Sequence, residues 1–178
     1  LKHRTTLDPD LFTNEDLMDE GEQALVEIAR AREIDLERLR TSSDFRRFLL
    51  TRGSESLVVD LVRDLSPQID VEKPEIHGIR DDSPREIMAN KLCTLLSRAE
   101  LRDLVDVRAL DREGLSIEEH LPLAAAKDAG LTAGQLAWVL SQIEIGDDAT
   151  PPGGVSATEL QAFVESLIQR LTAMAYPD

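Results

Sequence analysis

Residues 83–110 read SPREIMANKLCTLLSRAELRDLVDVRAL, and this stretch predicts two consecutive helices that the rest of the chain holds in place. Ser83 is followed by proline at the first helical position and then by Glu86, the pattern of an N-cap with a capping box. Apolar residues recur at helical spacing, and Lys91 falls inside the margin of the apolar face. Arg98 lies one heptad later on the same edge. The first helix is therefore expected to carry two cations beside its buried face.

The second predicted helix, residues 101–110, combines an apolar surface with two acids. It is apolar nearly all round, which predicts burial, yet Asp103 and Asp106 lie about 60° apart on one side of it. Buried acids are costly unless they are paired or bound to a cation. Two interpretations stay open. Either Lys91 extends its ammonium group to solvent and Arg102 pairs with Asp106, or Lys91 belongs to a cluster of charged side chains that carries the function.

Composition limits the possible classes of protein. The 178 residues are 42% hydrophobic and 3% aromatic, which predicts one domain with an aliphatic core and a helical appendage. A net charge of −15 argues against a general nucleic-acid binder or a membrane-surface protein. Residues 30–52 hold seven arginines against four acids. This positive window fits either a contact with a phosphate backbone or a solvated charged hairpin.

Three features bear on the compartment and the chain ends. Cys93 is the only cysteine, so an internal disulfide is excluded and a reducing cytoplasm is expected. No run approaches the ~18 apolar residues of a membrane span. The chain begins at Leu1 rather than at methionine, inside a strand-like segment, and we expect the natural N-terminus to lie upstream.

Two aspartates near the N-terminus are candidates for cation binding. Residues 6–12 alternate as a strand would, so Asp8 and Asp10 share one face, with Cα atoms roughly 7 Å apart. That spacing suits one or two hard cations held between two carboxylates. Pro9 removes a backbone donor, which restricts this segment to an edge or irregular strand.

A third acid, Asp60, lies in the middle of an apolar run. It belongs either to a fully buried central strand or to the solvent-exposed face of a strand that is buried on one side only, and the two interpretations are equally supported. The other predicted elements are a helix over 14–32, strands over 34–40, 45–52 and 56–63, one or two strands within 67–80, and helices that begin after Ser116, Thr132 and Ser156.

Several segments together, in order along most of the chain, resemble the nucleotidyltransferase AbiEii/AbiGii toxin family. These are bacterial proteins of type IV toxin–antitoxin and phage abortive-infection systems. The resemblance is carried by Arg4-x-Thr6-x-Asp8-x-Asp10, Val59-Asp60-Leu61, Glu86…Asn90-Lys91-Leu92, Arg98, Arg102-Asp103-Leu104-Val105-Asp106 and residues 127–138.

The resemblance implies an α+β fold, with a small nucleotidyltransferase-like mixed sheet and an all-helical C-terminal part. Residues 1–82 would form the α/β core, and residues 83–178 would complete the site and pack on that core. In the family a Gly-Ser loop that cradles nucleotide phosphates immediately precedes the R-x-T-x-D-x-D segment, so this loop would lie upstream of Leu1. Pro9 departs from the aliphatic residue that usually separates the two aspartates.

The resemblance also implies roles for individual residues. Asp8 and Asp10 would bind Mg²⁺ on the triphosphate, and Asp60 would be a third metal-binding carboxylate and the candidate for activating the acceptor hydroxyl. Lys91 would contact the nucleotide, and Asp103 would complete the site, with Asp106 as a further candidate. The implied catalytic set is Asp60, Lys91, Asp103 and Asp106. The implied nucleotide-binding set is Arg4, Thr6, Lys91, Arg98 and Arg102.

The expected function is a Mg²⁺-dependent nucleotidyltransferase toxin that transfers NMP from an NTP, GTP or another, to a tRNA-like RNA acceptor. Its expected partners are the NTP, the RNA and a cognate antitoxin, in the bacterial cytoplasm and away from membranes. The residue types suit this chemistry, since nucleotidyl transfer needs carboxylates for the metal and cations on the phosphates. The alternatives are a catalytically degenerate binding module and a small-molecule nucleotidyltransferase.

Overall fold

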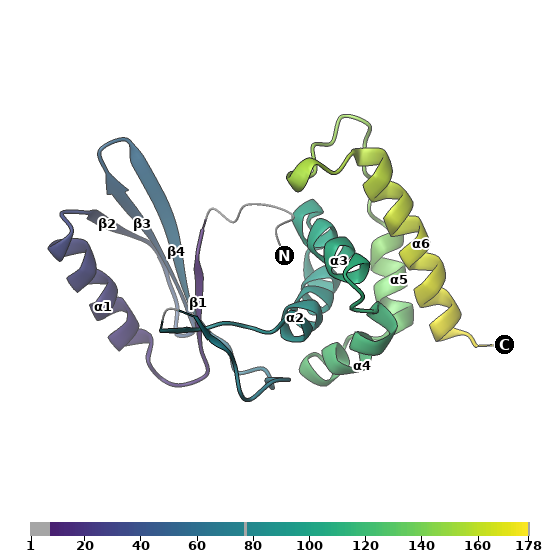
Figure 1. Ribbon diagram of the computed structural model, residues 1–178, viewed down its shortest axis with the longest axis horizontal. Helices are drawn as coiled ribbons and strands as arrows, with labels where there is room; N and C mark the ends of the chain where they lie inside the picture. The colour runs from purple at the N-terminus through teal and green to yellow at the C-terminus, as the bar shows by residue number, and fades with distance from the viewer. Residues whose placement is uncertain (1–7, 77, 178) are drawn as a thin grey trace. The chain divides into compact units, whose positions relative to one another are not determined.

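The chain begins with a four-stranded sheet and one helix (Figure 1). The computed structural model describes residues 8–76 and 78–177. The strand order is β1-β4-β3-β2, where β1 runs parallel to β4 and the other neighbours are antiparallel. The elements of this sheet unit, which ends at Ser66, are β1 (Asp10–Thr13), α1 (Met18–Ala31), β2 (Asp35–Thr41), β3 (Phe45–Arg52) and β4 (Glu55–Arg63).

The core of the sheet unit lies between α1 and one face of the sheet. Side chains alternate along a strand, so Phe48 of β3 and Val59 of β4 face α1, where Met18 covers them. Asp60 consequently faces away from α1. It is only 7% exposed, and β4 lies between β1 and β3, as the buried interpretation predicts.

β1 is a short edge strand, as Pro9 predicts. The strand starts at Asp10, directly after the proline, whose carbonyl accepts a hydrogen bond of 3.2 Å from the backbone N–H of Asp60. Proline lacks an N–H to donate to a ladder, but its carbonyl can still pair with a neighbouring strand. This contact sets β1 beside the middle of β4.

The second part, the helical unit, starts at Pro67. Its core is formed by Leu, Val, Ile, Ala and Met side chains, as the low aromatic content predicts. This mixed α+β architecture with a helical C-terminal part confirms the predicted fold class. The elements are β5 (Glu75–Ile76), β6 (Ile79–Arg80), α2 (Pro84–Ser97), α3 (Leu101–Arg112), α4 (Ile117–Lys127), α5 (Ala133–Ser141), η1 (Pro152–Gly154) and α6 (Ala157–Ala175).

Glu86 differs from its predicted role. Ser83 caps α2 as expected, since its hydroxyl accepts the backbone N–H of Glu86 at 3.1 Å. The Glu86 carboxylate does not complete a capping box; it accepts the backbone N–H groups of Ile69 and Asp70 at 2.8 and 3.1 Å and pairs with Lys127. These bonds tie residues 67–82, which were predicted to belong to the α/β core, to the helical unit.

The helices contain no candidate for a membrane span within residues 8–76 and 78–177, because none of them combines the necessary length and hydropathy. Polar interactions between helices are instead a prominent feature. Arg170 of α6 donates two hydrogen bonds to Asp111 of α3 and two to Glu118 of α4, with lengths of 2.6 to 3.0 Å. One guanidinium therefore joins three helices.

This Arg170 cluster predicts a pH dependence of stability. The hydrogen bonds from Arg170 lower the pKa of Glu118 from 4.5 to about 2, against the effect of burial. Because the folded pKa is depressed, the stabilisation is present above about pH 4.5 and is lost as the pH falls toward about 2. Arg170→Gln should therefore lower the free energy of unfolding at neutral pH. The difference in free energy of unfolding between this variant and wild type should be smaller at about pH 2 than at neutral pH.

Urea unfolding at several pH values measures this prediction. Arg112→Gln is a matched control, because Arg112 ends α3 with an exposed side chain and the substitution makes the same change in net charge. The control should follow the wild-type pH profile. An Arg170→Gln difference that is constant from neutral to acidic pH would contradict the assigned role of the Arg170–Glu118 pair.

Candidate functional site

The three predicted metal-binding acids belong to the sheet unit, and two of them, Asp10 and Asp60, share the face opposite α1. Asp10 lies directly across from Asp60 in the parallel β1–β4 register. Asp8 precedes Asp10 by two positions, and one of its carboxylate oxygens accepts the backbone N–H of Val58 at 3.4 Å. Asp8 and Asp10 are exposed, whereas Asp60 is buried. The pairing of β1 with β4 thus brings Asp10 beside Asp60, and Asp8, just before β1, contacts the backbone of β4.

A cation, Arg47, lies among these carboxylates, and sequence reasoning missed it. Its Nε and one Nη donate to the two carboxylate oxygens of Asp60 at 2.8 and 2.6 Å. The hydrogen bond to Asp60 raises the pKa of Arg47, partial burial opposes that effect, and the charges of Asp60, Asp10 and Asp8 add to it. Bidentate pairs of this kind fix geometry as well as charge.

The remaining predicted charges meet in the helical unit. The Lys91 ammonium on α2 lies 2.8 Å from an oxygen of Asp103 and 2.7 Å from one of Asp106, both on α3. The Asp103 side chain is fully buried and that of Asp106 is 6% exposed. Arg98 adds a contact of 3.2 Å to the other Asp103 oxygen. The predicted burial of the two acids is confirmed, and Lys91 compensates both.

Three other predicted residues stand outside these two groups. Arg102 forms an ion pair with Glu100 at 2.8 Å. Arg4 and Thr6 lie outside the described residues. The predicted packing of the helical part on the α/β core concerns both units and stays a prediction.

The sheet carboxylates have suitable chemistry for a hard cation, but they are not arranged as a finished metal site. Carboxylate oxygens are the ligands that Mg²⁺ uses in proteins, and the Arg47 guanidinium already occupies a cation's position beside them. Both oxygens of Asp60, however, are bound to Arg47. Within the described ranges, no three His, Cys, Asp or Glu side chains are grouped closely enough to hold a metal.

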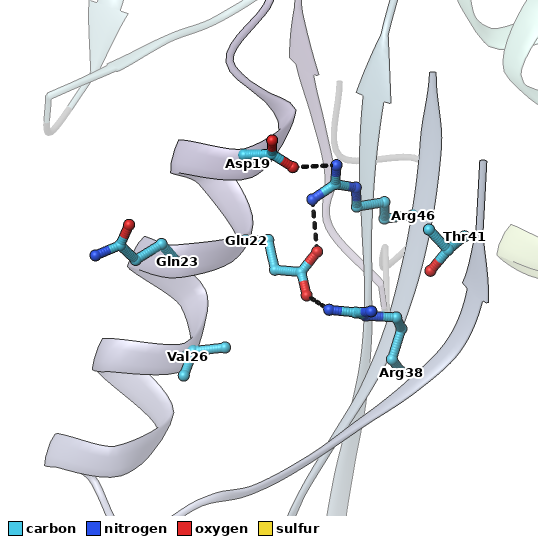
Figure 2. Close-up of a pocket in the computed structure, with 7 residues that line it drawn as sticks. All are labelled: Asp19, Glu22, Gln23, Val26, Arg38, Thr41 and Arg46. Carbon is cyan, nitrogen blue, oxygen red and sulfur yellow. Dashed lines mark hydrogen bonds and ion pairs between the residues drawn. The ribbon is translucent and has the colours of Figure 1, made fainter. Parts of the chain in front are cut away.

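A separate hollow of about 470 Å³ lies in the sheet unit between α1 and strands β2 and β3 (Figure 2). Arg46 lies between Asp19 and Glu22 at 2.5 and 2.6 Å, and Glu22 also pairs with Arg38. The lining of this hollow contains none of the predicted site residues. The lining residues are Asp19, Glu22, Gln23, Val26, Arg38, Thr41 and Arg46.

These ion pairs bear on the positive window of residues 30–52. Arg38 and Arg46 are paired with acids of α1, and Arg47 is paired with Asp60. Arg40 lies over the Phe45 ring, 5.6 Å from its centroid. Much of the excess positive charge is therefore compensated within the sheet unit.

Comparison with known proteins identifies the family. The AbiEii family model, described as "Nucleotidyl transferase AbiEii toxin, Type IV TA system", matches residues 1–176 and confirms the resemblance predicted from the sequence. A search of the curated proteins finds no match.

Two crystal structures share the fold. One, described as a "putative nucleotidyltransferase from H. pylori", is 16% identical with a TM-score of 0.50, and the match covers 97% of this chain and 82% of that chain. The other, JHP933 from Helicobacter pylori, is 18% identical with a TM-score of 0.52, and the match covers 97% of this chain and 79% of that chain.

Proposed function

Since the chain belongs to the AbiEii family of nucleotidyl transferase toxins of type IV toxin–antitoxin systems, we propose that it transfers NMP from an NTP to an RNA acceptor in a Mg²⁺-dependent reaction. The observation that carries the proposal is the β1–β4 register, which sets Asp10 opposite Asp60, with Asp8 two positions before Asp10 and in contact with the backbone of β4. Carboxylates gathered on neighbouring strands suit a reaction in which phosphate charge must be neutralised.

In this proposal Asp8, Asp10 and Asp60 would hold the divalent cation. When bound, the cation would shield phosphate charge and orient the attacking and leaving oxygens. Asp60 is also the candidate acceptor for the proton of the attacking hydroxyl, because a carboxylate positioned beside that hydroxyl can act as a general base. The buried position of Asp60, against the exposed Asp8 and Asp10, supports a distinct role for it.

The proposed role of Lys91 and Arg98 is to place positive charge on the nucleotide phosphates. Lys91 is fixed by two buried carboxylates and keeps 21% of its side chain exposed, and Arg98 keeps 47%. A cation held in place before the reaction stabilises developing charge without reorganisation. Asp103 and Asp106 would then act as positioning residues that orient Lys91.

The acceptor and the biological setting complete the proposal. A tRNA-like acceptor would have to approach a chain of net charge −15, so bound cations would reduce the repulsion at the site. The type IV description of the family implies a cognate antitoxin. We propose a role in phage defence in the bacterial cytoplasm, with GTP or another NTP as the donor.

A second candidate is a catalytically degenerate nucleotidyltransferase fold that serves as a binding module. The observation that favours it is Arg47, which occupies both oxygens of Asp60. Calorimetry with Mg²⁺ and each NTP separates the two candidates, because a degenerate module should show no metal-dependent heat. A small-molecule nucleotidyltransferase is a third candidate, and the acidic surface would suit cationic acceptors.

The proposed function is tested by incubating the protein with each labelled NTP and cellular RNA. We expect transfer of label to RNA with one NTP, and we expect Asp8→Ala and Lys91→Ala to lose it. Labelling that survives both substitutions would rule out the mechanism. Label on a small cationic acceptor, with none on RNA, would favour the third candidate.

The same assay predicts a specific effect of Asp10→Asn. Removing one of three carboxylate charges should raise the Mg²⁺ concentration for half-maximal transfer by about tenfold or more, since two opposite unit charges about 4 Å apart attract by about 1 kcal/mol even in bulk water and a divalent cation doubles that attraction. Asp35→Asn is the matched control, because Asp35 is exposed on the opposite edge strand β2. An unchanged Mg²⁺ dependence for Asp10→Asn would remove Asp10 from the metal-binding set.

A further inference from the structure

Arg47 holds the only one of the three sheet carboxylates that is buried. It comes from β3, where it lies opposite Asp60 in the antiparallel β3–β4 register. Both guanidinium contacts are short, at 2.8 and 2.6 Å, and together they use both Asp60 oxygens. Each Asp60 oxygen keeps a second lone pair, but a divalent cation bound there would lie close to the positive guanidinium, so Arg47 in this position opposes metal binding.

The position of Arg47 is reinforced from a second side. Its guanidinium lies over the Phe45 ring, 5.5 Å from the centroid, and Arg40 lies over the same ring at 5.6 Å. Cation–π contacts of this type add to the orientation given by the ion pair. Arg47 nevertheless keeps 47% of its side chain exposed, so its guanidinium can leave Asp60 by moving into solvent.

Arg47 and a divalent cation have the same electrostatic function at this place. Asp8 and Asp10 are near enough for their charges to act on Arg47 together with that of Asp60. A buried carboxylate needs a partner, and one partner can replace another when the exchange leaves no charge uncompensated. The two cations would therefore exclude each other at Asp60.

We propose that Arg47 is a positioning residue that competes with the divalent cation for Asp60, so that metal binding requires Arg47 to leave this carboxylate. The proposal rests on the proposed function, because it assumes that Asp60 binds a metal during the reaction. The proposal assigns Arg47 a second effect as well. When no metal is bound, Arg47 neutralises the buried charge of Asp60 and so stabilises the sheet.

The test measures binding of Mn²⁺, as a Mg²⁺ substitute, by calorimetry and by the electron paramagnetic resonance signal of free Mn²⁺. The variants are Arg47→Gln, Arg47→Lys and the control Arg40→Gln. Arg40→Gln removes the same charge from the same aromatic ring, and Arg40 lies opposite Arg47 in the β2–β3 register. Nucleotide transfer is assayed in parallel on wild type.

We expect Arg47→Gln to bind Mn²⁺ at least about tenfold more tightly than wild type, because a hydrogen bond to a charged group typically contributes more than a factor of ten. Arg47→Lys keeps the charge but loses the bidentate contact, so its Mn²⁺ affinity should lie between those of wild type and Arg47→Gln. The Mn²⁺ affinity of Arg40→Gln should stay within about twofold of wild type. Added Mn²⁺ should also raise the melting temperature of Arg47→Gln more than that of wild type.

Two results would overturn the proposal. If Arg47→Gln binds Mn²⁺ no more tightly than wild type, while wild type transfers nucleotide, the role of Arg47 fails and the proposed function stands. If Arg40→Gln tightens binding as much as Arg47→Gln, the effect is general charge and not competition at Asp60. Absence of Mn²⁺ binding in every variant, with no transfer by wild type, would overturn both proposals.

Discussion

Replacing Lys91 by methionine is expected to lower the rate of nucleotide transfer by about 100-fold or more and the free energy of unfolding by about 3 kcal/mol. The two effects have separate causes. Transfer loses a cation that was fixed before the reaction. Folding suffers because Asp103 and Asp106, which are almost inaccessible to solvent, lose their shared partner, although Arg98 still contacts Asp103. Urea unfolding and the labelled-NTP assay measure the two quantities.

A double variant separates the structural role of Lys91 from its functional role. Lys91→Met with Asp103→Asn leaves one fewer buried charge, so part of the lost stability should return while transfer stays low. Arg85→Met is the matched control on the same helix. The Arg85–Asp70 pair is 3.5 Å long with Arg85 55% exposed, so its loss should cost less than about 1 kcal/mol. Transfer at the wild-type rate by a folded Lys91→Met variant would make Lys91 purely structural.

Lys127→Met is expected to lower the free energy of unfolding by about 3–5 kcal/mol, the largest loss of stability that we predict. The side chains of Glu86 and Lys127 are 0% and 4% exposed, so neither charge can be compensated by water once the other is removed. Burial raises the pKa of Glu86, but the hydrogen bonds from Lys127 and from the N–H groups of Asp70 and Ile69 give a net lowering. The cost should therefore decrease as the pH falls below about 4.5.

Two measurements and one control variant test the Glu86–Lys127 pair. Urea unfolding gives the stability, and hydrogen exchange at the amides of Ile69 and Asp70 reports whether residues 67–82 stay attached to α2. Lys73→Met is the matched control, because the Lys73–Asp82 pair is more exposed, at 19% and 27%, and its loss should cost about 1 kcal/mol. Equal losses in the two variants would show that burial does not determine the cost.

Local patterns predicted most of the elements because the information lies within each segment. The alternation over residues 34–40, 45–52 and 56–63 and the N-caps at Ser116, Thr132 and Ser156 each depend on nearby residues alone. Glu86 shows the limit of this reasoning. Its spacing from Ser83 fits a capping box, but partners from Lys127, 41 positions away, and from the 67–70 backbone outweigh that local option.

The site was predicted in part, and for similar reasons. The helical spacing gave the positions of Lys91, Asp103 and Asp106 around their helices, but only packing of α2 on α3 brings the lysine to both acids. Arg47 was missed although a signal existed. The two-residue turn Gly53-Ser54 fixes the register of the hairpin, and counting outward from it pairs Arg47 with Asp60.

The parallel pairing of β1 with β4 has a consequence for the order of folding. Asp60 and Arg47 lie 13 positions apart within one hairpin, whereas Asp10 and Asp60 lie 50 positions apart. Closing the longer loop costs more chain entropy, and contacts distant in sequence form more slowly. We therefore expect Arg47 to engage Asp60 before the first strand docks, so that a newly made chain brings Asp10 beside Asp60 only at a late stage of folding.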